Sequence, residues 1–88
     1  MQPDVIDLMD KNLTDTHLLK LIDYMRDKEA IKRLNLRRNK ITSAGVIALA
    51  RFIKKHDNTM VEINLNRNRI ELKGAQALID AVHSTIRL

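Results

Sequence analysis

Apolar and polar residues alternate along three short segments of the chain, which begin at residues 6, 34 and 63. When the segments are aligned, three of their positions are aliphatic in every copy: Ile6, Leu34 and Ile63; Leu8, Leu36 and Leu65; Leu13, Ile41 and Ile70. The first two of these positions are separated by one polar residue, which is typical of a short strand with one buried face. The pattern therefore predicts three strands, with 28 residues from Ile6 to Leu34 and 29 from Leu34 to Ile63.

Each predicted strand is followed by apolar residues at positions i, i+3, i+4 and i+7, the pattern of an amphipathic helix. The three stripes are Leu18, Leu21, Ile22 and Met25; Val46, Leu49, Ala50 and Ile53; and Ala75, Leu78, Ile79 and Val82. Thr14, Thr42 and Glu71 precede the stripes, where each helix needs an N-cap. The sequence thus predicts three helices that bury these stripes.

Glycine recurs in the first turn of two of these helices, at Gly45 and Gly74, although Gly is unfavourable there by about 1 kcal/mol. This recurrence predicts close packing against the neighbouring repeat, while the first repeat has His17 at the same position. One strand and one helix cannot bury their apolar faces alone, so the units must stack. We expect the stack to form a short parallel sheet on a concave side with helices on the convex side.

The segments Leu34–Ile41 and Ile63–Ile70 resemble the leucine-rich-repeat consensus LxLxxNxL. With a long helix and a Gly four residues after the last aliphatic position, they are similar to the ribonuclease-inhibitor-like subfamily, and the resemblance covers residues 5–88. It implies an α/β fold: a short right-handed α/β solenoid, or horseshoe segment, of about three leucine-rich repeats. The motif describes a scaffold and names no chemistry.

We expect residues 1–88 to form one leucine-rich-repeat domain, which the repeat period divides into consecutive repeats. We expect repeats at residues 5–30, 31–59 and 60–85, and the start of a further strand at 86–88. Two explanations of this last segment stay open. The chain is either part of a longer solenoid, or it self-associates by pairing this C-terminal edge with another chain.

The resemblance also assigns a role to two asparagines. In the family, the consensus Asn turns inward and satisfies backbone groups where the strand ends, and Asn39 and Asn68 hold that position here. In the first repeat the position falls on Lys11, with Asn12 one place later. Because Lys cannot accept a hydrogen bond, we expect the first turn to differ locally or to lie at a solvated end of the fold.

The residues that alternate with the buried aliphatics should face outward on the concave side. They are Val5, Asp7 and Met9 in the first repeat, Arg33, Asn35 and Arg37 in the second, and Glu62, Asn64 and Asn66 in the third, with Arg38 and Arg67 at the strand ends. Arg binds carboxylates and phosphates with a forked geometry. These residues either recognise a protein partner or simply face water, and the group of four arginines favours recognition.

The net charge of +5 is concentrated in the middle of the chain, because residues 31–59 hold eight bases and one acid. Such a cluster attracts an acidic protein, nucleic acid or an anionic lipid surface. Nucleic acid is disfavoured because Tyr24 and Phe52 are the only aromatic residues, and bases stack on aromatic side chains.

Several classes of chemistry find no support in the sequence. The chain lacks Cys, and His17, His56 and His83 fall in three different repeats without the i, i+4 pairing of a zinc helix, so we expect no metal and no cofactor. No phosphate-binding Gly motif and no activated nucleophile is recognisable. The N-terminus has no basic region followed by an apolar run, and no segment reaches the length of a membrane span. We therefore expect a non-enzymatic, cytoplasmic protein.

Two functional hypotheses follow. The first is a scaffold or regulator that binds a protein with an acidic surface through the concave face; relatives of the subfamily bind nucleases, small GTPases, actin or signalling partners, which is what the resemblance implies. The alternative is electrostatic binding of nucleic acid or anionic lipid by the basic middle repeat.

Overall fold

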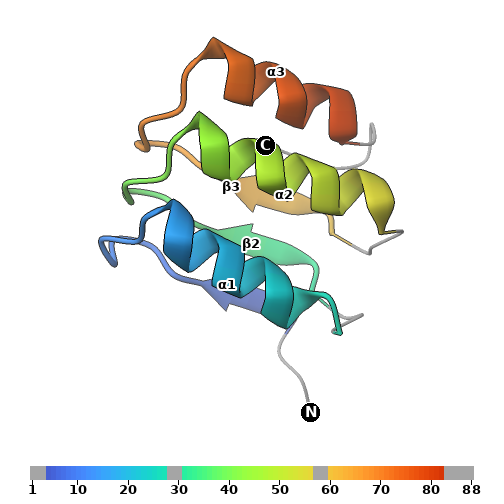
Figure 1. Cartoon of the computed structure of the whole chain (residues 1–88). Helices are drawn as coiled ribbons and strands as arrows, with labels where there is room; N and C mark the ends of the chain where they lie inside the picture. The colour runs from blue at the N-terminus through green and yellow to red at the C-terminus, as the bar shows by residue number, and fades with distance from the viewer. Residues whose placement is uncertain (1–3, 28–30, 57–59, 83–88) are drawn as a thin grey trace.

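The computed structural model describes residues 4–27, 31–56 and 60–82, in which strands and helices alternate (Figure 1). The strands are β1 (Val5–Asp7), β2 (Arg33–Asn35) and β3 (Glu62–Asn64), and the helices are α1 (Asp15–Met25), α2 (Ser43–Lys55) and α3 (Leu72–Ala81). All three predicted strands and all three predicted helices are therefore confirmed.

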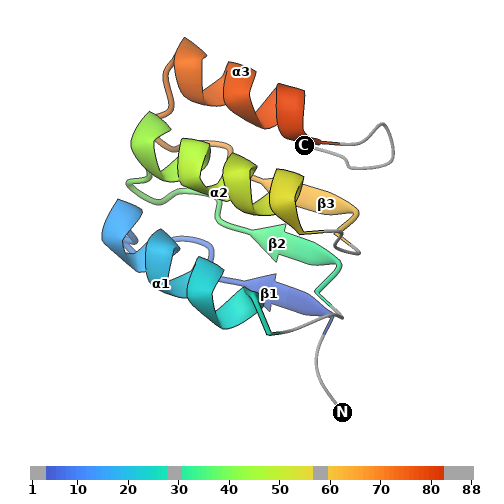
Figure 2. The same ribbon diagram turned by 45° about the vertical axis from the view of Figure 1, so that its right-hand side comes forward.

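The strands form one parallel sheet in the order β1-β2-β3. Ile6 is in register with Leu34, and Leu34 with Ile63, which confirms the alignment of the three repeats. The helices lie side by side in a second layer that covers one face of the sheet (Figures 1 and 2). The other face of the sheet carries no element among the described residues. The chain thus folds as a short α/β solenoid.

The core lies between the two layers. Its most deeply buried side chains have an exposed fraction of 1% or less and come from both layers: Leu34, Leu36, Ile41 and Ile63 from the strands and the turns after them, and Leu18, Val46 and Leu49 from the helices. These are positions that the two periodicities assign to the interior. The core therefore forms where the inward side chains of the strands, selected by a period of 2, pack against the inward side chains of the helices, selected by a period of 3.6.

One stripe position was predicted wrongly. Ile79 is 63% exposed, whereas Ile22 and Ala50, which hold the same position in the first two helices, are buried. The reason is that α2 covers Ile22 and α3 covers Ala50, while no described residue covers this side of α3. The predicted further strand at residues 86–88 lies outside the described residues.

The predicted N-caps Thr14, Thr42 and Glu71 are confirmed as the residues that start the helices. The Thr42 hydroxyl oxygen accepts a hydrogen bond from the Ala44 N–H at 3.3 Å. At Thr14 the backbone N–H donates to Nδ1 of His17 at 3.0 Å. The Glu71 side chain makes no capping hydrogen bond, so this helix start depends on other contacts.

Those contacts come from the preceding helix. The Ser43 hydroxyl, on the first residue of α2, accepts a hydrogen bond from the Glu71 N–H at 2.9 Å. One repeat earlier, the Asp15 carboxylate accepts from the Thr42 N–H at 2.8 Å and from the Thr42 hydroxyl. The first residue of one helix thus holds the N-cap of the next and ties adjacent repeats together.

This arrangement explains the recurrent glycines. A Cβ on Gly45 would stand 3.0 Å from Cγ of Asp15, and a Cβ on Gly74 would stand 2.8 Å from Cα of Ser43. Each glycine leaves room for the preceding helix to approach. His17 holds the same position in α1, which has no preceding helix among the described residues, and its side chain is exposed.

We expect Gly74→Ala to lower the free energy of unfolding by about 1–3 kcal/mol, because the new methyl meets the Ser43 backbone, which cannot rotate away. In an open helix the same change stabilises by about 1 kcal/mol, so the sign of the effect is itself a test. Urea denaturation followed by circular dichroism measures it.

The matched comparison is Gly45→Ala, which meets the side chain of Asp15 and the end of the Leu18 side chain instead of a backbone atom. On an Asp15→Ala background it should add no further loss of stability, whereas Gly74→Ala should cost as much on a Ser43→Ala background as in the wild type. Relief of the Gly74→Ala effect by Ser43→Ala would contradict the close backbone approach.

Candidate functional site

The outward-facing residues of the three strands meet on one surface, which we call the strand face. It comprises Val5, Asp7, Met9, Arg33, Asn35, Arg37, Arg38, Glu62, Asn64, Asn66 and Arg67. Parallel pairing places Arg33 between Val5 and Glu62, and Asn35 between Asp7 and Asn64. The structure therefore brings together residues that lie 28 or 29 positions apart in the sequence.

Three side chains of the strand face bind their own backbone. Oδ1 of Asp7 accepts a hydrogen bond from the Met9 N–H at 3.2 Å, and Oδ1 of Asn35 from the Arg37 N–H at 3.1 Å. Oδ1 of Asn64 makes the same bond, with the Asn66 N–H, at 3.0 Å. These are Asx turns, which end each strand in the same way. Sequence reasoning missed this role, although the recurrence of Asp or Asn at one position of all three repeats was a signal for it.

Arg33 has carboxylates on both sides. Its guanidinium lies 3.9 Å from the Asp4 carboxylate and 4.0 Å from that of Glu62, with about half of its side chain exposed. Exposed pairs at such distances contribute little stability, but they reduce the positive potential at this point. Of the four arginines that the sequence analysis grouped as a recognition site, three therefore keep a positive charge that no neighbouring carboxylate offsets.

The other three arginines, Arg37, Arg38 and Arg67, form no ion pair with the residues that the structure describes. Arg38 and Arg67 are exposed and adopt the left-handed conformation, each with φ of 59°. That conformation costs a non-Gly residue about 1 kcal/mol or more, and both residues occupy the same position of the turn after the strand. The turns therefore hold these two cations at one edge of the strand face.

Arg37 differs from these two because it is half-buried. Its Nε is inaccessible to solvent and has no hydrogen-bond partner within residues 4–27, 31–56 and 60–82. A buried donor without an acceptor destabilises a fold by about 1–3 kcal/mol. The strand face thus contains one cation that is partly removed from water and not neutralised.

At the β1 end the strand face exposes two apolar side chains beside the carboxylate of Asp7. Val5 is 41% exposed and Met9 is 43% exposed. Apolar side chains with a charged rim are typical of surfaces that bind proteins, and flexible Met side chains adapt to the shape of a partner.

Asn39 and Asn68 lie below this surface and have structural roles. Asn39 is buried, and its Oδ1 accepts from the Lys11 N–H at 3.0 Å and the Leu13 N–H at 2.9 Å. Its Nδ2 donates to the carbonyl oxygens of Leu8 and Leu36, both at 2.9 Å. Asn39 therefore satisfies the turn of the first repeat, where Lys11 cannot do so.

Asn68 performs the same function one repeat later. Its Oδ1 accepts from the Ile41 N–H at 3.0 Å, and its Nδ2 donates to the Leu36 carbonyl oxygen at 2.8 Å. The first turn differs from the other two, as expected: Asn12 has a positive φ, whereas the residues at its position in the later repeats, Lys40 and Arg69, do not. The positive φ of Asp10 is common to all three turns, because Arg38 and Arg67 share it.

Other chemistry is not apparent in the described part of the chain. It contains no group of three or more His, Asp or Glu side chains that could hold a metal ion. None of its helices is long and apolar enough to span a membrane. Two of the three histidines have other contacts: Nδ1 of His17 accepts a hydrogen bond from the N-cap of α1, and the ring centroid of His56 lies 4.8 Å from that of Phe52. The third, His83, lies outside the described residues.

Stacked strand–helix units joined by turn asparagines define a repeat protein of the α/β solenoid class. The model of the Leucine Rich repeat family matches residues 31–50 and 56–79, which is half of the chain. The protein belongs to the leucine-rich repeat family. No curated protein and no solved structure matches it significantly. Leucine-rich repeats generally mediate binding between proteins and are typically not enzymes.

Proposed function

We propose that this protein is a non-catalytic interaction module that binds an acidic protein surface through its strand face. The observation that carries the proposal is Arg37, a half-buried cation whose Nε has no acceptor. Arg38, the next residue, and Arg67, its equivalent in the third repeat, are exposed cations without an ion pair in the described residues.

The desolvation of Arg37 favours binding. A guanidinium in water must lose its hydration before it pairs with a carboxylate, and this cost offsets most of the attraction. Arg37 has already lost part of that hydration in the folded protein. A partner carboxylate on its terminal nitrogens therefore gains attraction at a smaller cost, which is the effect of preorganisation.

The rest of the strand face supports a protein partner over a nucleic acid. Val5 and Met9 supply apolar contact area. The two aromatic residues of the chain, Tyr24 and Phe52, lie on helices α1 and α2, so neither can stack a base on the strand face. We infer a partner that combines carboxylates opposite the three arginines with apolar side chains opposite Val5 and Met9.

We expect the variant Arg37→Ala/Arg38→Ala/Arg67→Ala to lose this partner. Each charge-assisted hydrogen bond contributes about 1.5–3 kcal/mol, so each Arg→Ala change should weaken binding by about tenfold or more. Affinity capture with the immobilised chain, followed by mass spectrometry and titration of the captured protein, measures the loss.

The control is Lys20→Ala/Lys73→Ala, which removes two exposed cations from helices α1 and α3. It should retain the partner at moderate salt. Equal loss in both variants would show a nonspecific charge effect. Binding of duplex DNA or phosphatidylserine vesicles that falls steeply with salt, without a captured protein, would favour the alternative function.

Three finer points belong to the same proposal. Repeats of 28 and 29 residues with α-helices support membership of the ribonuclease-inhibitor-like subfamily. A role as a cytoplasmic scaffold or regulator is consistent with the fold.

Self-association through the last repeat is supported by the exposure of Leu72 and Ile79 on α3. Light scattering at several protein concentrations tests whether the chain self-associates.

A further inference from the structure

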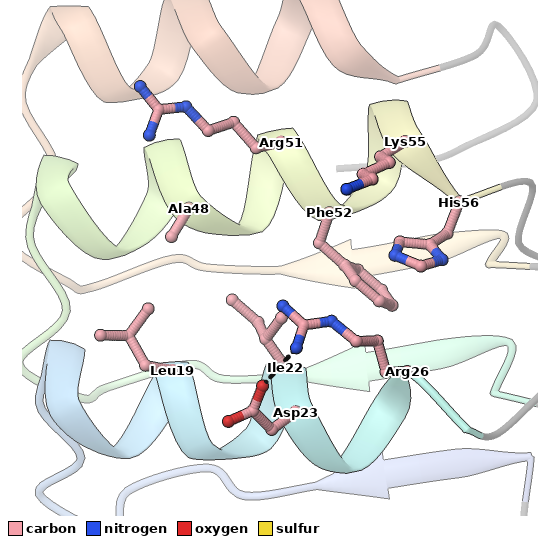
Figure 3. A pocket seen from close by; sticks show the side chains of 9 residues that line it. All are labelled: Leu19, Ile22, Asp23, Arg26, Ala48, Arg51, Phe52, Lys55 and His56. Carbon is pink, nitrogen blue, oxygen red and sulfur yellow. Dashed lines mark hydrogen bonds and ion pairs between the residues drawn. The ribbon is translucent and has the colours of Figure 1, made fainter.

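A second surface feature lies on the opposite, helical side of the molecule. A groove of about 700 Å³ runs between α1 and α2 (Figure 3). Leu19 and Ile22 of α1 and Ala48 and Phe52 of α2 line its apolar part, and the side chains of Leu19, Ala48 and Phe52 point into the space between the helices. Leu19 is half exposed, so apolar surface is accessible in the groove.

Cations surround this apolar part. Arg26, Arg51 and Lys55 line the groove together with a single carboxylate, that of Asp23. Arg26 pairs with Asp23 at 2.7 Å, so these two charges balance. Arg51 and Lys55 are exposed, stand four residues apart on α2 and have no ion pair in the part of the chain that the structure describes. Like charges at this spacing repel one another, so an acidic ligand would be stabilised here.

The equivalent groove between α2 and α3 provides an internal comparison. It measures about 210 Å³ and is lined by two cations, Lys54 and Arg51, of which Arg51 also lines the first groove. Its lining further includes Ala50, Ala81 and Asp80. In the repeat alignment these residues correspond to Ile22, Phe52 and Arg51 of the first groove. The two alanines therefore line the smaller groove, and the larger residues Ile22 and Phe52 line the larger one. Lys55 is a cation of the first groove only. The first groove is a property of these particular side chains, because the repeat geometry is common to both.

The dimensions of the groove fit a helix. Its lining residues run from Leu19 to Arg26 on α1 and from Ala48 to Lys55 on α2, which is two turns or about 10 Å on each side. A partner helix that lies in a groove contacts it through residues at i, i+3 or i+4, and i+7, which span the same two turns.

We propose that this groove binds an amphipathic helix of a partner protein, with apolar residues toward Phe52 and Leu19 and an acidic residue toward Lys55, while Arg51 adds positive charge at the border with the α2–α3 groove (Figure 3). The inference is independent of the strand face, which lies on the other side of the sheet. A membrane surface fits less well, because Ile22 and Phe52 are buried at the base of the groove, and interfacial lipid binding needs an apolar face that protrudes.

The test is a selection of phage-displayed peptides of about 16 residues on the immobilised chain, followed by titration of the selected peptides. We expect acidic peptides with apolar residues at i, i+3 or i+4, and i+7. Lys55→Glu and Leu19→Glu should each weaken their binding by about tenfold or more, because one reverses a charge at the groove and the other places a charge among its apolar side chains.

Two controls separate the groove from other surfaces. Lys54→Glu reverses a charge on the neighbouring residue, which lines the α2–α3 groove, and Arg67→Glu reverses one on the strand face. Both should retain peptide binding within about twofold, since rim charges of distant surfaces contribute little to affinity. Circular dichroism verifies that all four variants are folded.

Amide shifts in NMR spectra locate the bound peptide, and we expect the largest changes in residues 19–26 and 48–55. The proposal is overturned if the selected peptides lack acidic residues, or bind Lys55→Glu and Leu19→Glu as tightly as the wild type. It is also overturned if the shifts map to the strand face, or if phosphatidylserine vesicles bind in a Lys55-dependent way while the selection yields no peptide.

Discussion

Leu36→Ala should lower the free energy of unfolding by about 3–5 kcal/mol, the upper part of the range for a buried Leu. Leu36 has an exposed fraction of 0% and lies in the turn after β2, the central strand of the sheet. Its side chain belongs to the core shared by the repeats. The methyl groups removed would leave a cavity that neighbours from two layers cannot easily fill.

This loss is large for so small a protein. Natural domains have stabilities of about 0.05–0.15 kcal/mol per residue, so a chain of 88 residues is expected to have roughly 4–13 kcal/mol. Urea denaturation of Leu36→Ala, followed by circular dichroism, should show a strongly lowered midpoint or an unfolded protein at zero denaturant.

The control is the next residue, Arg37→Ala, which we expect to leave the stability unchanged or slightly increased. The substitution removes a buried Nε that has no hydrogen-bond partner in the described residues, and therefore removes a cost. Tolerance of Leu36→Ala together with unfolding by Arg37→Ala would mean that the strand register is wrong.

The register and most of the core could be predicted because they depend on local periodicity. Leu34 alternates with outward residues in its strand, and Leu49 stands at helical spacing from other apolar residues. The burial of each side chain can therefore be predicted from the local sequence pattern. Ile79 follows the same pattern and is exposed. Its burial depends on a neighbour that covers it, and a stripe in one helix carries no information about that neighbour.

The candidate sites could be predicted less well. The alternation predicted the outward position of the strand-face residues. The Asx turns of Asp7, Asn35 and Asn64 could not be predicted, because they depend on side-chain rotamers that a residue pattern does not specify. The groove between α1 and α2 was missed because the predicted stripe assigned Ile22 to the core and did not include Phe52, so the pattern indicated no surface between the two residues. It arises from the difference in size between this pair and the pair Ala50 and Ala81.

The two surfaces lie on opposite sides of the sheet and depend on different residues. The strand face is held by the sheet and the turns, whereas the groove is set by the packing of α1 against α2. The two proposals together imply that one molecule binds two partners at once. Arg67→Glu and Lys55→Glu should therefore affect binding at one surface each.

Asn39→Ala should lower the free energy of unfolding by about 3–4 kcal/mol, nearly as much as the loss of the Leu36 side chain. The substitution leaves the N–H groups of Lys11 and Leu13 and the carbonyl oxygen of Leu8 without the partner they have in the wild type. Each buried polar group left without a partner costs about 1–3 kcal/mol. The Leu36 carbonyl oxygen keeps a hydrogen bond from Asn68, which limits the loss.

The damage should be local to the first repeat, because Asn39 joins the second repeat to the turn of the first. Hydrogen exchange monitored by NMR should therefore show early loss of protection at the amides of Lys11 and Leu13. Asn66→Ala is the matched control: its side chain is exposed, and we expect a change within about 0.5 kcal/mol. Equal effects of Asn39→Ala and Asn66→Ala, or exchange that rises uniformly along the chain, would show that Asn39 does not hold the first repeat in place.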